Sequence, residues 1–373
     1  MKNRKTSAID PLAAEVSSLS RRFAERSLDS SYMDRTESRE AYGVYYGEVS
    51  HSKGVALGEE ILRRGDSSLF RKDHLRILDL GAGTGDFGLG VAESLLAAHP
   101  FSLSLHFVDR SKEALEAAVS GRGHSRLSLT VSQATLPKDR SYLSDGYDIV
   151  TMANCLAENE SQLDGFADLL AELARSILPG GLLLLVEPAD RRSSRALLTL
   201  GDDLISRHLP LHLLAPCPGG RTLPCPALRH SEDWCHEDRP ADFSEGLLKT
   251  AKLVGHVKDS LKMTYLLFGR GGTPPPPSLR LVSPLHREKG LFFGDFCDGN
   301  LWWRIRLLTR NRGDLTRAFT RLHRGESVAE GEPSSLASSP PLEGRGSIDW
   351  PRERPVIRLS HPDGRPFDPM DES

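Results

Sequence analysis

The stretch that decides the fold is Arg76-Ile-Leu-Asp-Leu-Gly-Ala-Gly-Thr-Gly-Asp-Phe-Gly88. Its apolar part, residues 77–80, predicts a buried strand, and a helical pattern follows from Phe87 to Ala98. The glycines at 81, 83 and 85 allow a sharp turn and a close approach of the backbone to a ligand. The helix N-terminus beyond them offers free N–H groups and a positive dipole end. The stretch therefore predicts a pocket for a nucleotide-like cofactor at the carboxyl edge of a parallel sheet.

Strands and helices alternate on the C-terminal side of this turn. Beyond the strand of the opening stretch, strands are expected at residues 103–108, 127–132, 147–153, 182–186 and 262–268. Helices are expected between most of them. Such alternation predicts an α/β fold, with a parallel sheet covered by helices on both faces.

Four regions are expected along the chain. Residues 1–66 form a helical N-terminal region in which tyrosines pack one helix on the next. Residues 67–270 carry the sheet, with a proline- and cysteine-rich insertion at 209–243. Residues 278–324 form a small, basic β-subdomain. Residues 325–373 are expected to be a largely disordered tail, apart from a returning strand near Val356, because Ser, Pro, Glu and Gly bury little surface.

The length, the net charge and the N-terminal sequence indicate where in the cell the protein is expected. The chain has 373 residues and a net charge of −3, and no run of about 18 apolar residues that would span a membrane. No apolar segment follows the basic start, and the acidic residues 10, 15, 25 and 29 argue against a transit peptide. We expect a cytoplasmic protein that does not contact a membrane and that is monomeric when it is not bound to a macromolecular partner.

Acidic residues near the glycine turn distinguish between the possible cofactors. Asp79 lies inside the strand end, where a carboxylate suits the ammonium group of S-adenosylmethionine (SAM) and would repel a pyrophosphate. Asp109 ends the next strand, 24 residues after Gly85, where an acid accepts ribose hydroxyls. Asn154 follows a later strand at the same edge. With Gly81, Gly83 and Gly85, these residues predict a SAM site and a class I, Rossmann-like methyltransferase sheet.

Three of the five cysteines, Cys217, Cys225 and Cys235, lie in the proline-rich insertion. Without disulfides, such a segment needs another link, and a metal centre converts binding energy into folding energy. Cys297, in the β-subdomain, is the best fourth ligand, and His236 is the reserve ligand of a Cys₃His zinc site. Cysteine followed by proline, which occurs twice here, is also found at iron–sulfur ligands. Cys155 has an apolar context and is expected in the core.

Over residues 30–325 the sequence resembles the mitochondrial-type small-ribosomal-subunit methyltransferase-like assembly factors and their bacterial relatives. The resemblance rests on the order of the Tyr-rich lead, Leu-Gly81-Ala-Gly-Thr-Gly, Glu187-Pro188, Ala215-Pro-Cys-Pro, Pro224-Cys-Pro, Trp234-Cys-His and Gly255-His256. It implies a [4Fe–4S] cluster on Cys217, Cys225, Cys235 and Cys297. It also implies that the partner is the small ribosomal subunit and its rRNA. The chain departs from the family pattern at Glu237-Asp238-Arg239, which is expected to alter the RNA-facing surface.

Residues 280–324 give separate support for RNA binding. They hold ten Lys and Arg against four Asp and Glu, a local excess of +6, with aromatic residues among them. A basic β-subdomain of this kind is a plausible platform for RNA through phosphate contacts, although the rings themselves are expected in its core. Trp302 and Trp303 point to opposite sides of a strand, so one of them is expected to be exposed.

Three functions remain open at this point. The first is a SAM-binding, iron–sulfur rRNA methyltransferase, with Asn154 and Glu158 near the methyl site. The second is a non-catalytic RNA-binding assembly factor, and the third is a small-molecule methyltransferase with a structural zinc. The compact three-cysteine loop of radical-SAM enzymes is absent from the sequence.

Overall fold

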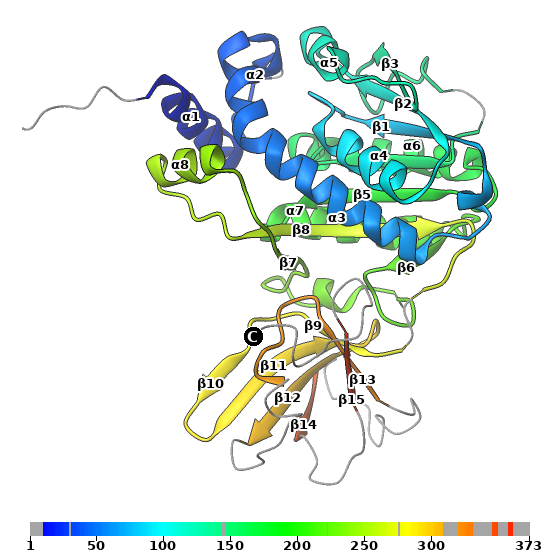
Figure 1. The fold of residues 1–373 in the computed structure, drawn as a ribbon. Coiled ribbons are helices and arrows are strands. Elements are labelled where there is room, and N and C mark those ends of the chain that lie inside the picture. Colours follow the sequence, from blue (N-terminus) through cyan, green and yellow to red (C-terminus); the bar gives the residue numbers. More distant parts are fainter. Residues whose placement is uncertain are drawn as a thin grey trace, which may run out of the picture.

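The protein contains two β-sheets, and each sheet has a hydrophobic core of its own (Figure 1). The computed structural model describes residues 10–29, 31–143, 146–221, 223–274, 277–308, 319–330, 345–349 and 357–360. Among the helices in these ranges, none has the length and apolarity needed to cross a bilayer.

The first sheet has eight strands in the order β3-β2-β1-β4-β5-β8-β6, with β7 paired to β8. Strands β1 to β5 are parallel to one another, whereas β8 is antiparallel to β5, β6 and β7. The strands are β1 (His74–Leu80), β2 (Ser102–Asp109), β3 (Leu127–Gln133), β4 (Ile149–Ala153), β5 (Leu182–Pro188), β6 (His212–Ala215), β7 (Glu237–Pro240) and β8 (Ser260–Gly269). The α/β prediction is confirmed, and the proline-rich insertion also contributes two short strands, β6 and β7.

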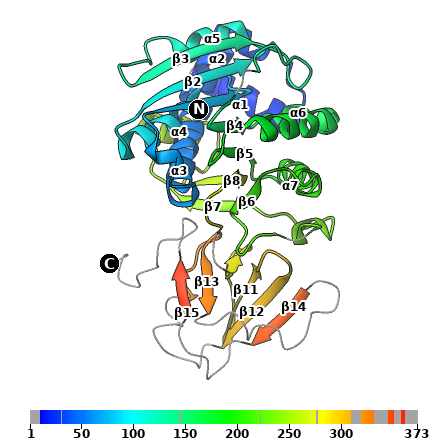
Figure 2. The same ribbon diagram turned by 90° about the vertical axis from the view of Figure 1, so that its right-hand side faces the viewer.

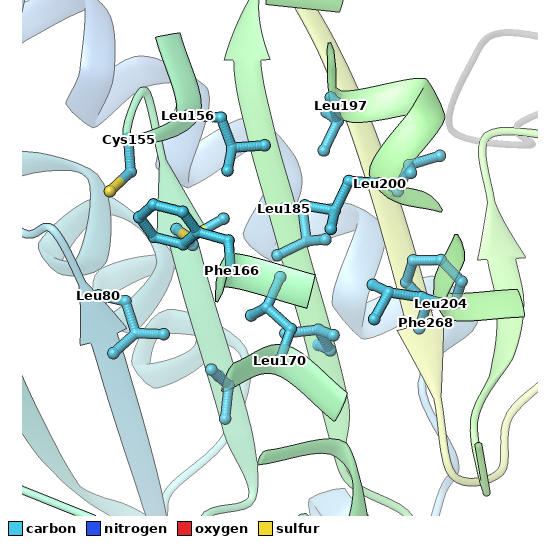
Figure 3. Packing of buried hydrophobic residues seen from close by; sticks show 14 of the residues in the cluster. Leu80, Cys155, Leu156, Phe166, Leu170, Leu185, Leu197, Leu200, Leu204 and Phe268 are labelled. Carbon is cyan, nitrogen blue, oxygen red and sulfur yellow. The ribbon is translucent and has the colours of Figure 1, made fainter. Parts of the chain in front are cut away.

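Helices cover both faces of this sheet. Leucines of α6 and α7 pack on one face, against Leu80, Leu185 and Phe268 of the strands (Figure 3). Side chains of α3, α4 and α5 pack on the other face. The helices of the domain are α3 (Glu48–Arg64), α4 (Asp86–Ala98), α5 (Lys112–Val119), α6 (Leu163–Ser176), α7 (Arg191–Ser206) and α8 (Glu245–Leu253). Cys155 is buried in the first of these cores, as predicted.

The N-terminal region is helical and packs at the carboxyl edge of the sheet. It consists of α1 (Pro11–Glu25), a short turn at Tyr32–Asp34, α2 (Thr36–Tyr42) and a wide helical turn at Gly43–Gly47 that continues into α3. Its tyrosines pack edge to face or stack on one another, and Tyr45 is 1% exposed. Together with α8 they form a separate apolar cluster.

The second sheet lies beside β6 and β7 (Figure 2). Its strands run in the order β14-β12-β11-β9-β13-β15, with β10 paired to β11. They are β9 (Leu279–Leu281), β10 (His286–Glu288), β11 (Leu291–Cys297), β12 (Trp302–Leu308), β13 (Ser327–Glu330), β14 (Arg345–Asp349) and β15 (Ile357–Ser360). β13 and β14 lie in the segment that was expected to be largely disordered, whereas β15 lies at the returning strand expected near Val356. The sequence of residues 314–324 also predicts a helix, and most of this segment falls outside the described residues.

Trp302 and Trp303 do point to opposite sides of β12, but neither is exposed. Trp302 is 8% exposed and belongs to the core of the first sheet, whereas Trp303 is 6% exposed and belongs to the core of the second. The expectation of one exposed tryptophan is therefore wrong, because each side of β12 is covered by a different core.

Candidate functional site

The glycine turn lies between β1 and α4, as the sequence predicts. Gly81, Gly83 and Gly85 all have positive φ, at 66°, 53° and 75°. A Cβ atom at Gly85 would lie 2.9 Å from the ring of Phe107, so a side chain there is excluded by space as well as by backbone geometry. The turn leaves a small cavity lined by Asp79, Gly81, Tyr42, Ser50 and Asn154, among others.

Asp79 is 1% exposed at the floor of this cavity. One carboxylate oxygen accepts a hydrogen bond from the hydroxyl of Thr151 at 2.6 Å. The other, Oδ2, is buried and has no hydrogen-bond partner among the described residues. Burial raises the pKa of the Asp79 carboxyl to about 7. A positively charged group in the cavity would satisfy this oxygen and restore the carboxylate.

Asp109 lies at the end of β2, and both of its carboxylate oxygens contact backbone amides. They accept hydrogen bonds from the N–H groups of Gly83 and Ser111, each at 2.9 Å. Burial raises the pKa of this carboxyl as well. Asp109 therefore fixes the glycine turn against α5, and acceptance of ribose hydroxyls stays a prediction.

The N-terminal region covers the turn from outside. The Met33 side chain lies 3.5 Å from the Cβ position of Gly83, and Asp34 accepts a hydrogen bond from the Ser111 hydroxyl at 2.6 Å. Tyr32 donates to Glu158 at 3.1 Å, and Glu158 also pairs with Arg110 at 3.2 Å. Glu158 is thus tied to both the N-terminal region and the edge of the sheet.

A much larger cavity, which we call the chamber, lies next to the glycine-turn cavity. Its volume is about 610 Å³. Its walls come from the N-terminal region, from the loops after β4 and β5, and from residues 256–262. Asn154, which has a φ of 56°, lines both cavities together with Tyr42 and Ser50, whereas Glu158 lines only the chamber. The two predicted catalytic residues therefore line neighbouring cavities, with Asn154 at the junction because it lines both.

Lys53 is a residue of this site that the sequence analysis missed. It lies on α3, lines the chamber and is only 7% exposed. Helical spacing placed it on a face of α3, but that face is closed by residues 256–262, about 200 positions later in the chain. A local pattern therefore contains no signal for it.

The four predicted metal ligands line a second, separate site. Cys217, Cys225, Cys235 and Cys297 all contact one small cavity between the insertion and the second sheet. Burial raises the pKa of the Cys297 thiol, and the neighbouring thiols of Cys217 and Cys235 raise it further. Within the described ranges, no group of three or more His, Cys, Asp or Glu side chains is close enough to hold a single metal ion.

Buried cations surround these thiols. Arg280 donates to the sulfur of Cys235 at 3.2 Å and pairs with Glu237 at 2.8 Å. The side chain of Arg221 is fully buried and pairs with Asp202. Glu237 also pairs with Arg239 at 2.6 Å and is 1% exposed. Glu237 therefore lies inside the molecule, and the expectation that it alters an RNA-facing surface is wrong.

His236 lines the same cavity, but its ring is engaged elsewhere. Its Nε2 atom lies 2.9 Å from an Arg324 guanidinium nitrogen. Burial and the neighbouring Arg324 lower the pKa of the imidazole to about 3, so it is neutral. Arg280 and Arg324, two of the cations counted toward RNA binding, thus belong to the surroundings of the cysteines.

Residues 52–217 match the family model of a methyltransferase domain. Over these residues the chain is similar to methyltransferase domains. Its mostly parallel sheet, with helices on both faces, has the Rossmann-like class I methyltransferase fold. The match covers the glycine turn, Asp79, Asp109 and Asn154, and ends at Cys217.

Several solved structures are similar to part of this chain. The plantazolicin methyltransferase BpumL, solved with SAH, is 13% identical, covers 69% of this chain and 100% of its own, and has a TM-score of 0.39. A putative class I S-adenosylmethionine-dependent methyltransferase from Listeria monocytogenes is 14% identical, covers 71% and 81%, and has a TM-score of 0.37. A methyltransferase from Pyrococcus furiosus is 14% identical, covers 58% and 83%, and has a TM-score of 0.34. A comparison with curated proteins finds no match.

Proposed function

We propose that the methyltransferase domain binds SAM and methylates rRNA of the small ribosomal subunit during its assembly, in a protein that also holds an iron–sulfur cluster. The observation that carries the SAM assignment is the Oδ2 atom of Asp79, buried beside the glycine turn without a partner in the described part of the chain. An unpaired buried carboxylate oxygen is costly, and an ammonium group removes that cost. SAM carries such a group, whereas the pyrophosphate of a dinucleotide would be repelled.

Each residue of the site has a role in this proposal. SAM supplies an electrophilic methyl group on a positively charged sulfonium. Asp79 would hold the ammonium end and Asp109 the ribose, while Asn154 lies where cofactor and acceptor meet. Burial raises the pKa of Glu158, which suits a group that accepts a proton from the acceptor. The N-terminal region excludes water from the turn, so the domain acts mainly by positioning.

The iron–sulfur assignment is supported by the four thiols that share a cavity and by the cations around them. A cluster bound by four thiolates is anionic, and Arg221 and Arg280 would balance its charge. The cluster would hold the insertion against the second sheet. A [4Fe–4S] cluster holds its cysteines farther apart than one zinc ion does, which is compatible with the absence of a tight single-ion group in the described ranges.

The RNA assignment is supported by exposed cations on the second sheet. Arg287 and Lys289 are exposed at the β10–β11 hairpin, which projects away from the methyltransferase domain (Figure 1). The Arg304 side chain is 48% exposed, pairs with Asp295 at 2.7 Å and lies over the ring of Phe293, at 5.3 Å. Phosphate contacts by such residues would give a salt-dependent affinity for RNA.

Metal and sulfide analysis of anaerobically purified protein tests the cluster. Wild type should be brown and contain iron and sulfide in [4Fe–4S] proportion, and Cys297→Ser should lose both. Cys155→Ser is the matched control, because Cys155 lies in the core, away from the cysteine cavity. Colourless wild-type protein with one zinc would overturn the cluster and favour the zinc alternative.

Methyl transfer from labelled SAM to isolated small-subunit rRNA tests the activity. The rival is a non-catalytic RNA-binding factor. Two observations favour it: the N-terminal region closes over the glycine turn, and both carboxylate oxygens of Asp109 already accept hydrogen bonds from backbone N–H groups. Tight binding of SAM and rRNA without transfer would establish that rival. Loss of SAM binding in Asp109→Ala, measured by calorimetry, would support the cofactor site in either case.

A further inference from the structure

The chamber contains two lysines without an anionic partner. Lys53, 7% exposed, makes no hydrogen bond or ion pair with any described residue. Lys258 lies over the ring of Tyr45, at 5.2 Å from its centroid, and no carboxylate within the described chain pairs with it. Burial and the neighbouring Lys258 lower the pKa of Lys53 to about 8. The two cations therefore repel each other inside one cavity.

The acids of the chamber are already engaged. Asp190 pairs with Arg26 at 3.6 Å, and Asp259 pairs with Lys262 at 3.8 Å. Glu158 is held by Tyr32 and Arg110, as described above. Glu187, whose charge favours the charged form of Lys53, accepts hydrogen bonds from the backbone N–H groups of Leu156 and Ala157. An anion from outside the chain would thus find two available cations.

Part of the chamber wall is aromatic. Tyr42 and Tyr46 are stacked with centroids 5.4 Å apart, and Tyr45 meets Tyr46 edge to face at 5.0 Å. Val257 lines the chamber and is 80% exposed, so the cavity reaches the surface at this residue. A planar group could enter there and pack on the rings, as bases do on aromatic side chains.

We infer that the chamber binds a single nucleotide of RNA, with its phosphate held by Lys53 and Lys258 and its base packed among Tyr42, Tyr45 and Tyr46. This inference rests on the proposed rRNA function and names the part of the RNA that the site receives. The volume of about 610 Å³ accommodates one nucleotide, and Asn154 lies at the junction of the chamber and the cofactor cavity, since it lines both. A nucleotide extruded from its strand, as in other enzymes that modify bases, would bring its base to that junction.

Binding of nucleoside monophosphates to the full chain, measured by calorimetry with SAH present, tests the site. Monophosphates should bind about tenfold more tightly than the matching nucleosides, because a charged hydrogen bond contributes about 1.5 kcal/mol or more. Lys53→Met and Lys258→Met should each remove this difference and leave SAH binding unchanged. Lys53→Arg should retain most of it. Lys249→Met, at an exposed position of α8 outside the chamber, is the control.

The outcomes separate this inference from the proposed function. Equal affinity for nucleosides and monophosphates, or no effect of Lys53→Met in protein that melts normally, would overturn the chamber assignment. If both lysine variants transfer methyl groups to rRNA at the wild-type rate, the chamber assignment is overturned and the proposed methyltransferase function still stands. Lysine-dependent binding of monophosphates without any transfer to rRNA would support the chamber and count against the enzymatic function.

Discussion

At the scale of single residues, Asp79 shows how one buried carboxyl couples stability to cofactor binding. Its pKa of about 7 lies above its ordinary value of 3.8. Between these two pH values the folded chain binds the proton and the unfolded chain does not, so this residue lowers the free energy of unfolding as pH rises from about 4 to 7. Above pH 7 the full cost, on the order of 4 kcal/mol from 1.36 kcal/mol per pKa unit, is present.

Replacing Asp79 with asparagine should therefore act differently at two pH values. At pH 8 the variant should be more stable than wild type by up to that amount, and at pH 4, close to the ordinary pKa of 3.8, the two should be nearly equal. SAM affinity at pH 8 should fall, because the amide cannot pair with an ammonium group. Thermal melts and calorimetry at both pH values measure this. A variant less stable than wild type at pH 8 would show that the carboxylate already has a partner in the folded protein.

The arrangement of site residues that lie close together in the sequence could be predicted. Contacts between residues that lie far apart in the sequence could not. Gly81, Gly83, Gly85 and Asp79 belong to one strand and its turn, so their spacing determines their geometry. Lys53 belongs to the chamber only because residues 256–262 close over α3, and a lysine in an amphipathic helix has the same pattern whether exposed or buried. The cysteines are predictable as a set, but composition counts Arg280 and Arg324 toward an RNA-binding surface because it cannot show that they contact the cysteines and His236.

At the scale of elements, α3 and α4 cross with their backbones in contact. A Cβ atom at Gly54 would collide with the carbonyl oxygen of Phe87, and one at Gly90 with that of His51. Because α4 begins at the glycine turn and α3 carries Lys53, this crossing holds the cofactor cavity and the chamber in register.

Gly90→Ala should force the two helices apart. We expect a loss of about 1–3 kcal/mol in the free energy of unfolding, as for overpacked cores, together with weaker SAM binding. Gly246→Ala on α8 is the control, because its nearest neighbour would lie at 3.7 Å and alanine favours a helix. Denaturant unfolding of both variants measures the difference. A Gly90→Ala protein as stable as Gly246→Ala would mean that the crossing is loose.

At the scale of the whole molecule, the two sheets are joined by a buried chain of charges beside the cysteine cavity. It runs from Cys235 through Arg280, Glu237 and Arg239 to Glu60 on α3. Composition could not show the strands β13 and β14, because they gain their partners from distant strands of the second sheet.

Removal of the proposed cluster should loosen this junction. We expect iron chelation, or Cys297→Ser, to speed cleavage by an added protease in the Gly- and Pro-rich segment 269–277, because the insertion would lose its link to the second sheet. Cys155→Ser should be cleaved like wild type. Mass spectrometry of the fragments locates the cut. Equal cleavage rates with and without iron would mean that packing alone holds the sheets together.

The position of β8 has a consequence for how the chain is made. β8 lies between β5 and β6 and also pairs with β7, yet all three precede it in sequence. While the protein is being synthesised, the leucines of β5 have an open edge until residue 269 has left the ribosome, and β6 has no strand to join. Such an edge invites pairing with other nascent chains. We therefore expect the nascent chain to be most prone to aggregation during the interval between Pro188 and Gly269.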